Sequence, residues 1–263
     1  MNNKSDTPEI VRLKGYHGIK WLADSFALFL KQPGSWLLIW LLYFAFNLLF
    51  ILSSILVLLP VLLSAAFSAG FVYAAKTLDD EGRLSIENLF YGFKFHFRAL
   101  FRLGMFYMLI VFIFGTVLSL VIDNYIDQNA LTKMREMPQQ ELQLYLQSAP
   151  QELQMILKAI MISFVLCFPF IMMTWHAPAL VLLDRLTPIE AMALSFKACY
   201  KNIQPFIIFW ILIISLFVFS AMTLFGLPIA LVIISISQYT SYRSSFRKEM
   251  DFEEKNGQGT FIV

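Results

Sequence analysis

Two stretches of about 40 residues contain no Asp, Glu, Lys, Arg or His, and they constrain this chain more than any other feature. They run from Trp36 to Ala75 and from Asn202 to Tyr242. A helix of that length would be roughly 60 Å long, about twice the thickness of the hydrocarbon core of a bilayer. Each stretch therefore predicts two membrane-spanning helices.

Two shorter apolar runs each predict one further span, because about 20 apolar residues suffice to cross a bilayer. They are Leu103–Ile122 and Ala159–Leu183, and the second contains one ionisable residue, His176. Only 14% of the chain is charged, where soluble domains average about 25%. The predicted fold is an all-α polytopic membrane protein with six transmembrane helices in three hairpins. The predicted spans are 36–57, 58–77, 103–123, 159–183, 204–224 and 227–243.

The distribution of basic residues predicts the orientation of these spans. With six spans, four segments must share one side: the N-terminal segment, the C-terminal tail and the connections after the second and fourth spans. These segments carry 17 of the 20 Lys and Arg residues. The opposite side has only Lys133, Arg135 and Lys158. Because basic loops stay in the cytoplasm, both termini are predicted to be cytoplasmic.

Three segments on the basic side resemble one another: Ile19–Lys31, Ile86–Arg98 and Ile189–Lys201. Each begins with Ile, has Phe seven positions later, and ends with a base. Its apolar positions form one stripe of a helix, which predicts a cytoplasmic amphipathic helix at the membrane interface before each hairpin. The alternative is that unrelated interfacial helices share this pattern. The predicted organisation is a single transmembrane domain over 1–263 with repeat units at about 19–77, 86–183 and 189–243.

The second hairpin carries a polar, Gln-rich insertion at 123–158 on the outer side. Leucines around Leu144 and Tyr145 predict a short helix within it. The insertion either binds a partner or caps the helix bundle.

A polar candidate site lies within the fourth span, at Trp175 and His176. Pro178 follows and frees the carbonyl group of Thr174, a potential partner for a nearby polar side chain. His176 forms either a gate or headgroup contact, or an interfacial pair with Trp175 in the aromatic belt.

Asn47 and Gln238 are two further polar candidates. Both lie within predicted spans, where an amide can bond to a neighbouring helix or contribute to a substrate site.

The sequence indicates no catalytic activity. It has no HExxH, GxSxG or P-loop motif, and its three His residues lack the spacing of metal ligands. No enzyme activity, cofactor or metal is therefore expected. Lys76, Asp123 and Arg243 lie at the ends of predicted spans, and the interiors of the spans contain no carboxylate, Lys or Arg, which argues against a proton-coupled pump. The net charge of +2 does not suggest a nucleic-acid partner.

Several short motifs resemble an uncharacterised family of six-span bacterial inner-membrane proteins from proteobacteria. The motifs are Gly18-x-x-Trp21, Ala177-Pro178-Ala179-Leu180-Val181, Ser195-Phe196-x-Ala198-Cys199-x-x-Asn202, Phe225-Gly226-Leu227-Pro228 and Ser237-x-Tyr239-x-Ser241-Tyr242-Arg243. The resemblance implies an inner-membrane location and no catalytic residues. The long insertion departs from the family pattern.

Three functions are compatible with these features. The charge-free interior favours a non-enzymatic scaffold or assembly role in the lipid bilayer. The repeat and the internal Pro169 favour a carrier for a lipid or hydrophobic small molecule. The basic surface alone suggests an enzyme acting on lipid headgroups. Protein partners and oligomeric state are not indicated.

Overall fold

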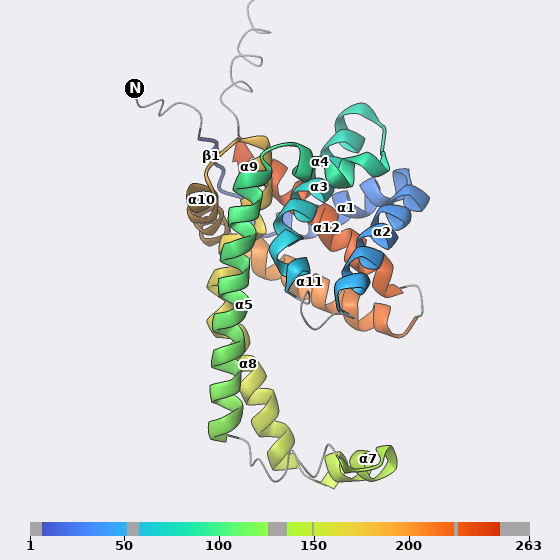
Figure 1. Cartoon of the computed structure of the whole chain (residues 1–263), viewed down its shortest axis with the longest axis vertical. Coiled ribbons are helices and arrows are strands. Elements are labelled where there is room, and N and C mark those ends of the chain that lie inside the picture. The colour runs from blue at the N-terminus through green and yellow to red at the C-terminus, as the bar shows by residue number, and fades with distance from the viewer. Residues whose placement is uncertain (1–6, 52–57, 126–135, 149, 224–225, 248–263) are drawn as a thin grey trace, which may run out of the picture. The chain divides into compact units, whose positions relative to one another are not determined.

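The computed structural model describes residues 7–51, 58–125, 136–148, 150–223 and 226–247. Within this part of the chain the fold is helical, as predicted, apart from one antiparallel pair of two-residue strands (Figure 1). The elements are β1 (Glu9–Ile10), α1 (His17–Lys31), α2 (Pro33–Ile51), α3 (Leu59–Glu81), the 3-10 helix η1 (Ile86–Phe90), α4 (Tyr91–Lys94), α5 (Phe97–Tyr125), α7 (Gln139–Ser148), α8 (Pro150–Trp175), α9 (Ala177–Leu183), α10 (Pro188–Lys201), α11 (Ile203–Ala221), α12 (Gly226–Ser245) and β2 (Phe246–Arg247).

Five segments are long and apolar enough to cross a membrane, as in a multi-pass membrane protein. They are Pro33–Phe50, Leu59–Glu81, Phe97–Leu120, Met161–Leu183 and Ile203–Ala221. Each overlaps one of the first five predicted spans. Residues 52–57 and 224 of the predicted spans lie outside the described residues. The helix α12 is not among the five, because Ser, Thr and Tyr residues lower the hydropathy of its C-terminal half.

The fourth predicted span, 159–183, is two helices rather than one. The helix α8 ends at Trp175, and α9 begins at Ala177 with Pro178 in its first turn. Proline lacks the N–H that would continue the helical hydrogen bonding, so the chain restarts after His176. Pro169 lies inside α8, as expected, and α7 confirms the short helix predicted within the insertion.

The second predicted surface helix, Ile86–Arg98, is not a continuous helix. It is divided into η1 and α4, followed by Phe95 in an extended conformation and His96 with a positive φ of 55°. Gly92 weakens the helix locally. The ring of Tyr91 stacks on Tyr73 and Phe95, which holds the turn in place.

The first and third predicted surface helices, α1 and α10, bury matching positions. In both helices the small residue six places after the first Ile is fully buried, namely Ser25 and Ser195. The first Ile is exposed in both, 56% for Ile19 and 68% for Ile189. The N-terminus of α10 is capped, since Thr187 and Glu190 form a capping box there.

The described residues form two compact units. The first comprises residues 1–107 and 172–263, and the second comprises 108–171. In the first unit, α12, α3 and α9 contact one another. The shorter elements pack around these three helices, with α1 on α12 and α11, η1 and α4 on α3, and α10 on α9.

A ridge of small residues on α3 allows a close approach of the backbone of neighbouring elements. Ala66, Gly70 and Ala74 on this ridge are buried. A Cβ atom on Gly70 would collide with the backbone carbonyl of Leu89, and one on Gly92 would collide with that of Ala66. The packing of η1 and α4 on α3 therefore depends on two glycines.

We expect Gly70→Ala to destabilise the protein by about 1–3 kcal/mol, because a rigid backbone has to move to make room for the methyl group. The measurement is the thermal unfolding midpoint in mild detergent. Gly34→Ala is the matched control, since a Cβ there meets nothing within 4 Å. Equal midpoints for the two variants would contradict the close packing.

Candidate functional site

The C-terminal half of α12 carries buried and half-buried hydroxyl groups that bond within their own helix. Ser237 donates to the carbonyl of Ile233 (2.8 Å), Ser241 to that of Ser237 (2.6 Å), and Ser244 to that of Thr240 (2.7 Å). A hydroxyl that donates in this way keeps its lone pairs for other donors. The α12 surface therefore presents a row of hydrogen-bond acceptors to its neighbours.

Two tryptophans from different helices use these acceptors. The indole nitrogen of Trp21 donates to Ser244 Oγ at 2.7 Å, and that of Trp175 donates to Ser241 Oγ at 2.9 Å. Both rings also pack against Phe206 and Phe209 of α11. The two indoles are thus held by one pair of aromatic rings and one row of hydroxyls.

A third contact joins α1 to α12 through Ser25. Its hydroxyl donates to the carbonyl of Trp21 at 2.7 Å and lies 2.9 Å from Ser237 Oγ and 3.0 Å from Thr240 Oγ1. This cluster is buried, and its members supply one another with donors and acceptors, so the polar groups are satisfied without water.

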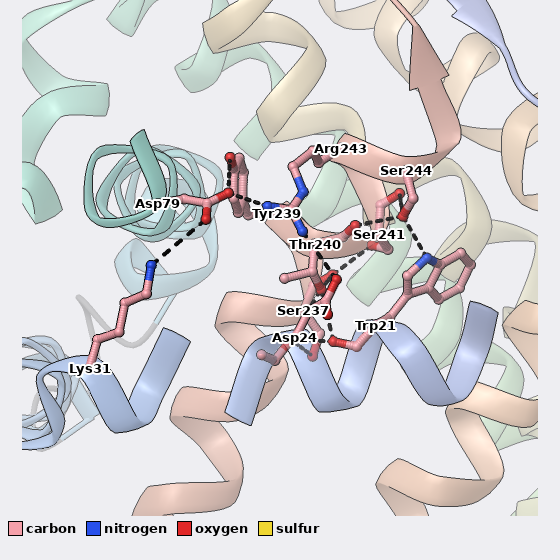
Figure 2. A network of polar contacts seen from close by, with 11 residues as sticks. Trp21, Asp24, Lys31, Asp79, Ser237, Tyr239, Thr240, Ser241, Arg243 and Ser244 are labelled. Carbon is pink, nitrogen blue, oxygen red and sulfur yellow. Dashed lines mark hydrogen bonds and ion pairs between the residues drawn. The ribbon is translucent and has the colours of Figure 1, made fainter. Parts of the chain in front are cut away.

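Charged groups gather at the end of this row, as Figure 2 shows. Asp79 of α3 accepts hydrogen bonds from Arg243 and, at 3.0 Å, from the Tyr239 hydroxyl. The guanidinium of Arg243 also bonds Asp24 of α1 at 3.1 Å, and Lys31 lies 4.0 Å from Asp79. These partly exposed ion pairs link α1, α3 and α12 at one end of the helices.

His176 lies at the break between α8 and α9 and is only 1% exposed. Its backbone N–H donates to Ser195 Oγ at 3.0 Å, and that hydroxyl donates to the Met172 carbonyl at 2.7 Å. Its ring Nδ1 lies 3.6 Å from Cys199 Sγ, and burial raises the pKa of the Cys199 thiol. The buried ring packs edge-on against Phe246. The gate or headgroup contact and the aromatic-belt pair both stay predictions.

A cavity of about 250 Å³ lies beside this break, between α2, α3, α5, α8 and α12. Its described lining is uncharged and rich in hydroxyl and amide groups: Tyr43, Ser64, Ser68, Phe71, Tyr107, Thr174, Trp175, Ser235 and Gln238. Ser68 Oγ donates to Gln238 Oε1 at 2.5 Å, and the Tyr107 hydroxyl donates to the Thr174 carbonyl at 3.1 Å. The second bond uses the carbonyl group that Pro178 was predicted to free.

The structure brings together two of the four predicted polar residues. Trp175 and Gln238 line the cavity, and Gln238 makes the bond between helices that its position suggested. Asn47 instead donates to the Tyr43 carbonyl of its own helix at 2.7 Å, so its predicted bond to another helix was wrong. His176 does not line the cavity.

Sequence reasoning missed the hydroxyl groups that complete the cavity, notably Ser64, Ser68 and Ser235. One signal was available, because Ser64 and Ser68 stand four residues apart in α3 and Ser235 stands three residues before Gln238 in α12, which places each pair along one side of its helix. Among the described residues, no group of three or more His, Cys, Asp or Glu side chains is placed to hold a metal ion.

No protein family, curated protein or solved structure matches this chain. The resemblance to an inner-membrane family therefore stays a prediction based on its short motifs.

We expect Ser195→Ala to destabilise the protein by about 1–3 kcal/mol, because it leaves the buried N–H of His176 without its acceptor. Thermal unfolding in detergent measures the effect. Ser215→Ala is the control, since that exposed hydroxyl bonds the Ile211 carbonyl within its own helix. An unfolding midpoint as high as that of the control would show that the break does not need Ser195.

Proposed function

We propose that this chain is a six-span protein of the bacterial inner membrane, with both termini in the cytoplasm, that holds a lipid or hydrophobic small molecule by a neutral polar group. The observation that carries the ligand proposal is the uncharged, hydroxyl-lined cavity between apolar helices. The topology has independent support.

Contacts between segments far apart in the sequence support the proposal that the four basic segments lie on the same side of the membrane. The strand β1 pairs with β2 near the other end of the chain, and Asn202 binds the backbone of Val11 and Leu13. The side chain of Gln32 donates to the Gly82 carbonyl at 3.2 Å. Since an odd number of spans would separate the termini, the pairing of β1 and β2 favours an even number.

The physical character of α12 supports its role as the sixth span. Its polar side chains Ser237, Thr240 and Ser241 are buried against other helices and hydrogen-bonded. A helix in hydrocarbon tolerates polar groups when the protein itself satisfies them. Hydropathy counts these groups as exposed to lipid, so it underestimates the ability of α12 to span.

We expect reporter fusions to show this topology. Green fluorescent protein fused after Glu81 or after Val263 will fluoresce, because both sites are cytoplasmic. Alkaline phosphatase fused after Gln140 will be active, because the insertion faces the periplasm. Immunoblotting controls for expression of each fusion. An active phosphatase at the C-terminus would mean an odd number of spans.

The chemistry of the cavity defines the kind of ligand. Its lining donates and accepts hydrogen bonds but has no charge to neutralise an ion, and burying an unpaired charge there would be costly. About 250 Å³ is smaller than a pocket for a whole drug-sized ligand. The cavity therefore suits the hydroxyl or amide end of an amphiphile whose apolar part lies against the helices.

We expect Gln238→Leu to weaken ligand retention by about 3- to 20-fold, the equivalent of one hydrogen bond in a membrane interior. Native mass spectrometry of the protein purified in mild detergent measures the bound fraction. Gln204→Leu makes the same chemical change on exposed α11 surface and serves as the control. A ligand held equally by both variants, or no ligand in the unaltered protein, would contradict the proposal.

A scaffold or assembly role is the second candidate. It is favoured by the exposed apolar surface of α2, where Leu41, Phe44 and Leu49 are 54%, 46% and 71% exposed. The same mass spectra separate the two functions, because a scaffold would retain protein subunits rather than a small amphiphile. The cavity provides no corresponding support for an enzyme acting on headgroups.

A further inference from the structure

A second pocket, of about 470 Å³, lies where the N-terminal segment meets the end of α12, apart from the uncharged cavity. Its lining includes Arg12, Lys14, His17, Lys20 and Arg243. This volume falls within the range of about 300–1,000 Å³ that is usual for ligand pockets. The pocket is thus strongly basic and large enough for a small anionic group.

The backbone that carries Arg12 and Lys14 is fixed by hydrogen bonds. Asn202 accepts from the N–H of Leu13 at 2.7 Å and donates to the carbonyl of Val11 at 2.9 Å. The N–H of Val11 donates to the Ser245 carbonyl at 2.9 Å. Because successive side chains of an extended segment alternate, this arrangement turns Val11 and Leu13 inward and leaves Arg12 and Lys14 exposed. The two cations are therefore presented by a preformed frame.

Three of the cations that line the pocket are not neutralised by nearby carboxylates. Within the described residues, the amino or guanidinium groups of Arg12, Lys14 and Lys20 have no carboxylate within 4.0 Å, whereas Arg243 pairs with Asp79 and Asp24. The pocket also adjoins the first turn of α1, which is described throughout and contains no acidic residue. The positive end of the helix dipole adds to the same charge. An anion would relieve this repulsion.

The surroundings of the pocket indicate where that anion is found. On α1 the apolar residues Ile19 and Leu30 face outward, and Tyr16 beside the pocket is 58% exposed. Exposed apolar, aromatic and basic side chains on one short helix are typical of the headgroup region of a membrane. The headgroups of the cytoplasmic leaflet include anionic phospholipids, which attract basic groups nearby.

We propose that this pocket binds the phosphate group of an anionic phospholipid headgroup, with Arg12, Lys14 and Lys20 as its cationic contacts. The site is independent of the uncharged cavity, because it is lined by different residues and binds an anionic group rather than a neutral one. It requires only that the chain is embedded in a bilayer.

The test compares two double variants of the full chain that lose the same charge. Arg12→Gln with Lys14→Gln removes two pocket cations, and Arg83→Gln with Lys197→Gln removes two exposed bases on other elements. Each protein is titrated with phosphatidylglycerol in neutral detergent micelles, and the thermal unfolding midpoint is followed. We expect phosphatidylglycerol to stabilise the unaltered protein and the control variant alike. The pocket variant is expected to lose affinity by roughly tenfold or more.

Three further measurements identify the source of the phosphate and show whether a loss of affinity is due to misfolding. Inorganic phosphate at millimolar concentration is expected to raise the unfolding midpoint much less than phosphatidylglycerol does. If phosphate raised it equally, and the pocket variant abolished that effect, the ligand would be a soluble anion and the lipid assignment would be overturned. Phosphatidylcholine, which has no net charge, is expected to give none. If Arg12→Gln with Lys14→Gln lowers the starting midpoint, Lys20→Gln alone is titrated. Equal losses in pocket and control variants, or no phosphatidylglycerol shift, would overturn the proposal.

Discussion

Polar groups in a membrane interior must find their partners within the protein, and α12, the proposed sixth span, would meet that requirement through its hydroxyl groups. Its hydroxyls donate along their own helix and accept from the indoles of Trp21 and Trp175. Since these donors come from α1 and α8, and Asp79 of α3 binds Arg243, α12 has fixed partners on three neighbouring elements. The most polar of the proposed spans is therefore central, while few residues of the more apolar α2 are buried and many of those in α3 are.

One position in the three similar segments shows why they pack as they do. Six residues after the first Ile stand Ser25, Gly92 and Ser195, all of them small and buried. Each touches a helix proposed to return to the cytoplasm: Ser25 meets α12, Gly92 meets α3, and Ser195 bonds to the α8–α9 break. The second and third segments directly follow the helix they contact, whereas the first, α1, packs on α12, which lies far along the chain. In the proposed topology, each of the three segments thus contacts a helix that returns to the cytoplasm. Three copies of one repeat unit would make such contacts, and α1 and α12 make theirs between the two ends of the described chain.

The sequence predicted which segments leave water, but not which side of each helix meets the protein. Absence of charge located five segments able to span a membrane, and Pro178 correctly indicated that the Thr174 carbonyl accepts a hydrogen bond from a side chain, that of Tyr107. The apolar stripe containing Ile19, however, faces outward, while Trp21 and Ser25 face inward. In water the apolar face of a helix turns inward, but in a membrane lipid accepts apolar groups, and small or hydroxyl-bearing residues mark the protein interface instead. The same ambiguity explains the error at Asn47, because the partner of its side chain depends on the rotation of its helix.

The two proposed sites differ in chemistry for the same electrostatic reason. The interaction of two charges grows as the surrounding dielectric falls, and so does the cost of leaving either one unpaired. Between the spans, where Ser68 and Gln238 lie, a phosphate would have no cation to neutralise it. At the end of α12, the proposed membrane interface, water and headgroups would lower that cost, and Arg12 and Lys14 line the pocket there. A molecule retained in the cavity is thus expected to be neutral, and an anionic headgroup is restricted to the interfacial pocket, so the two ligands do not compete for one site.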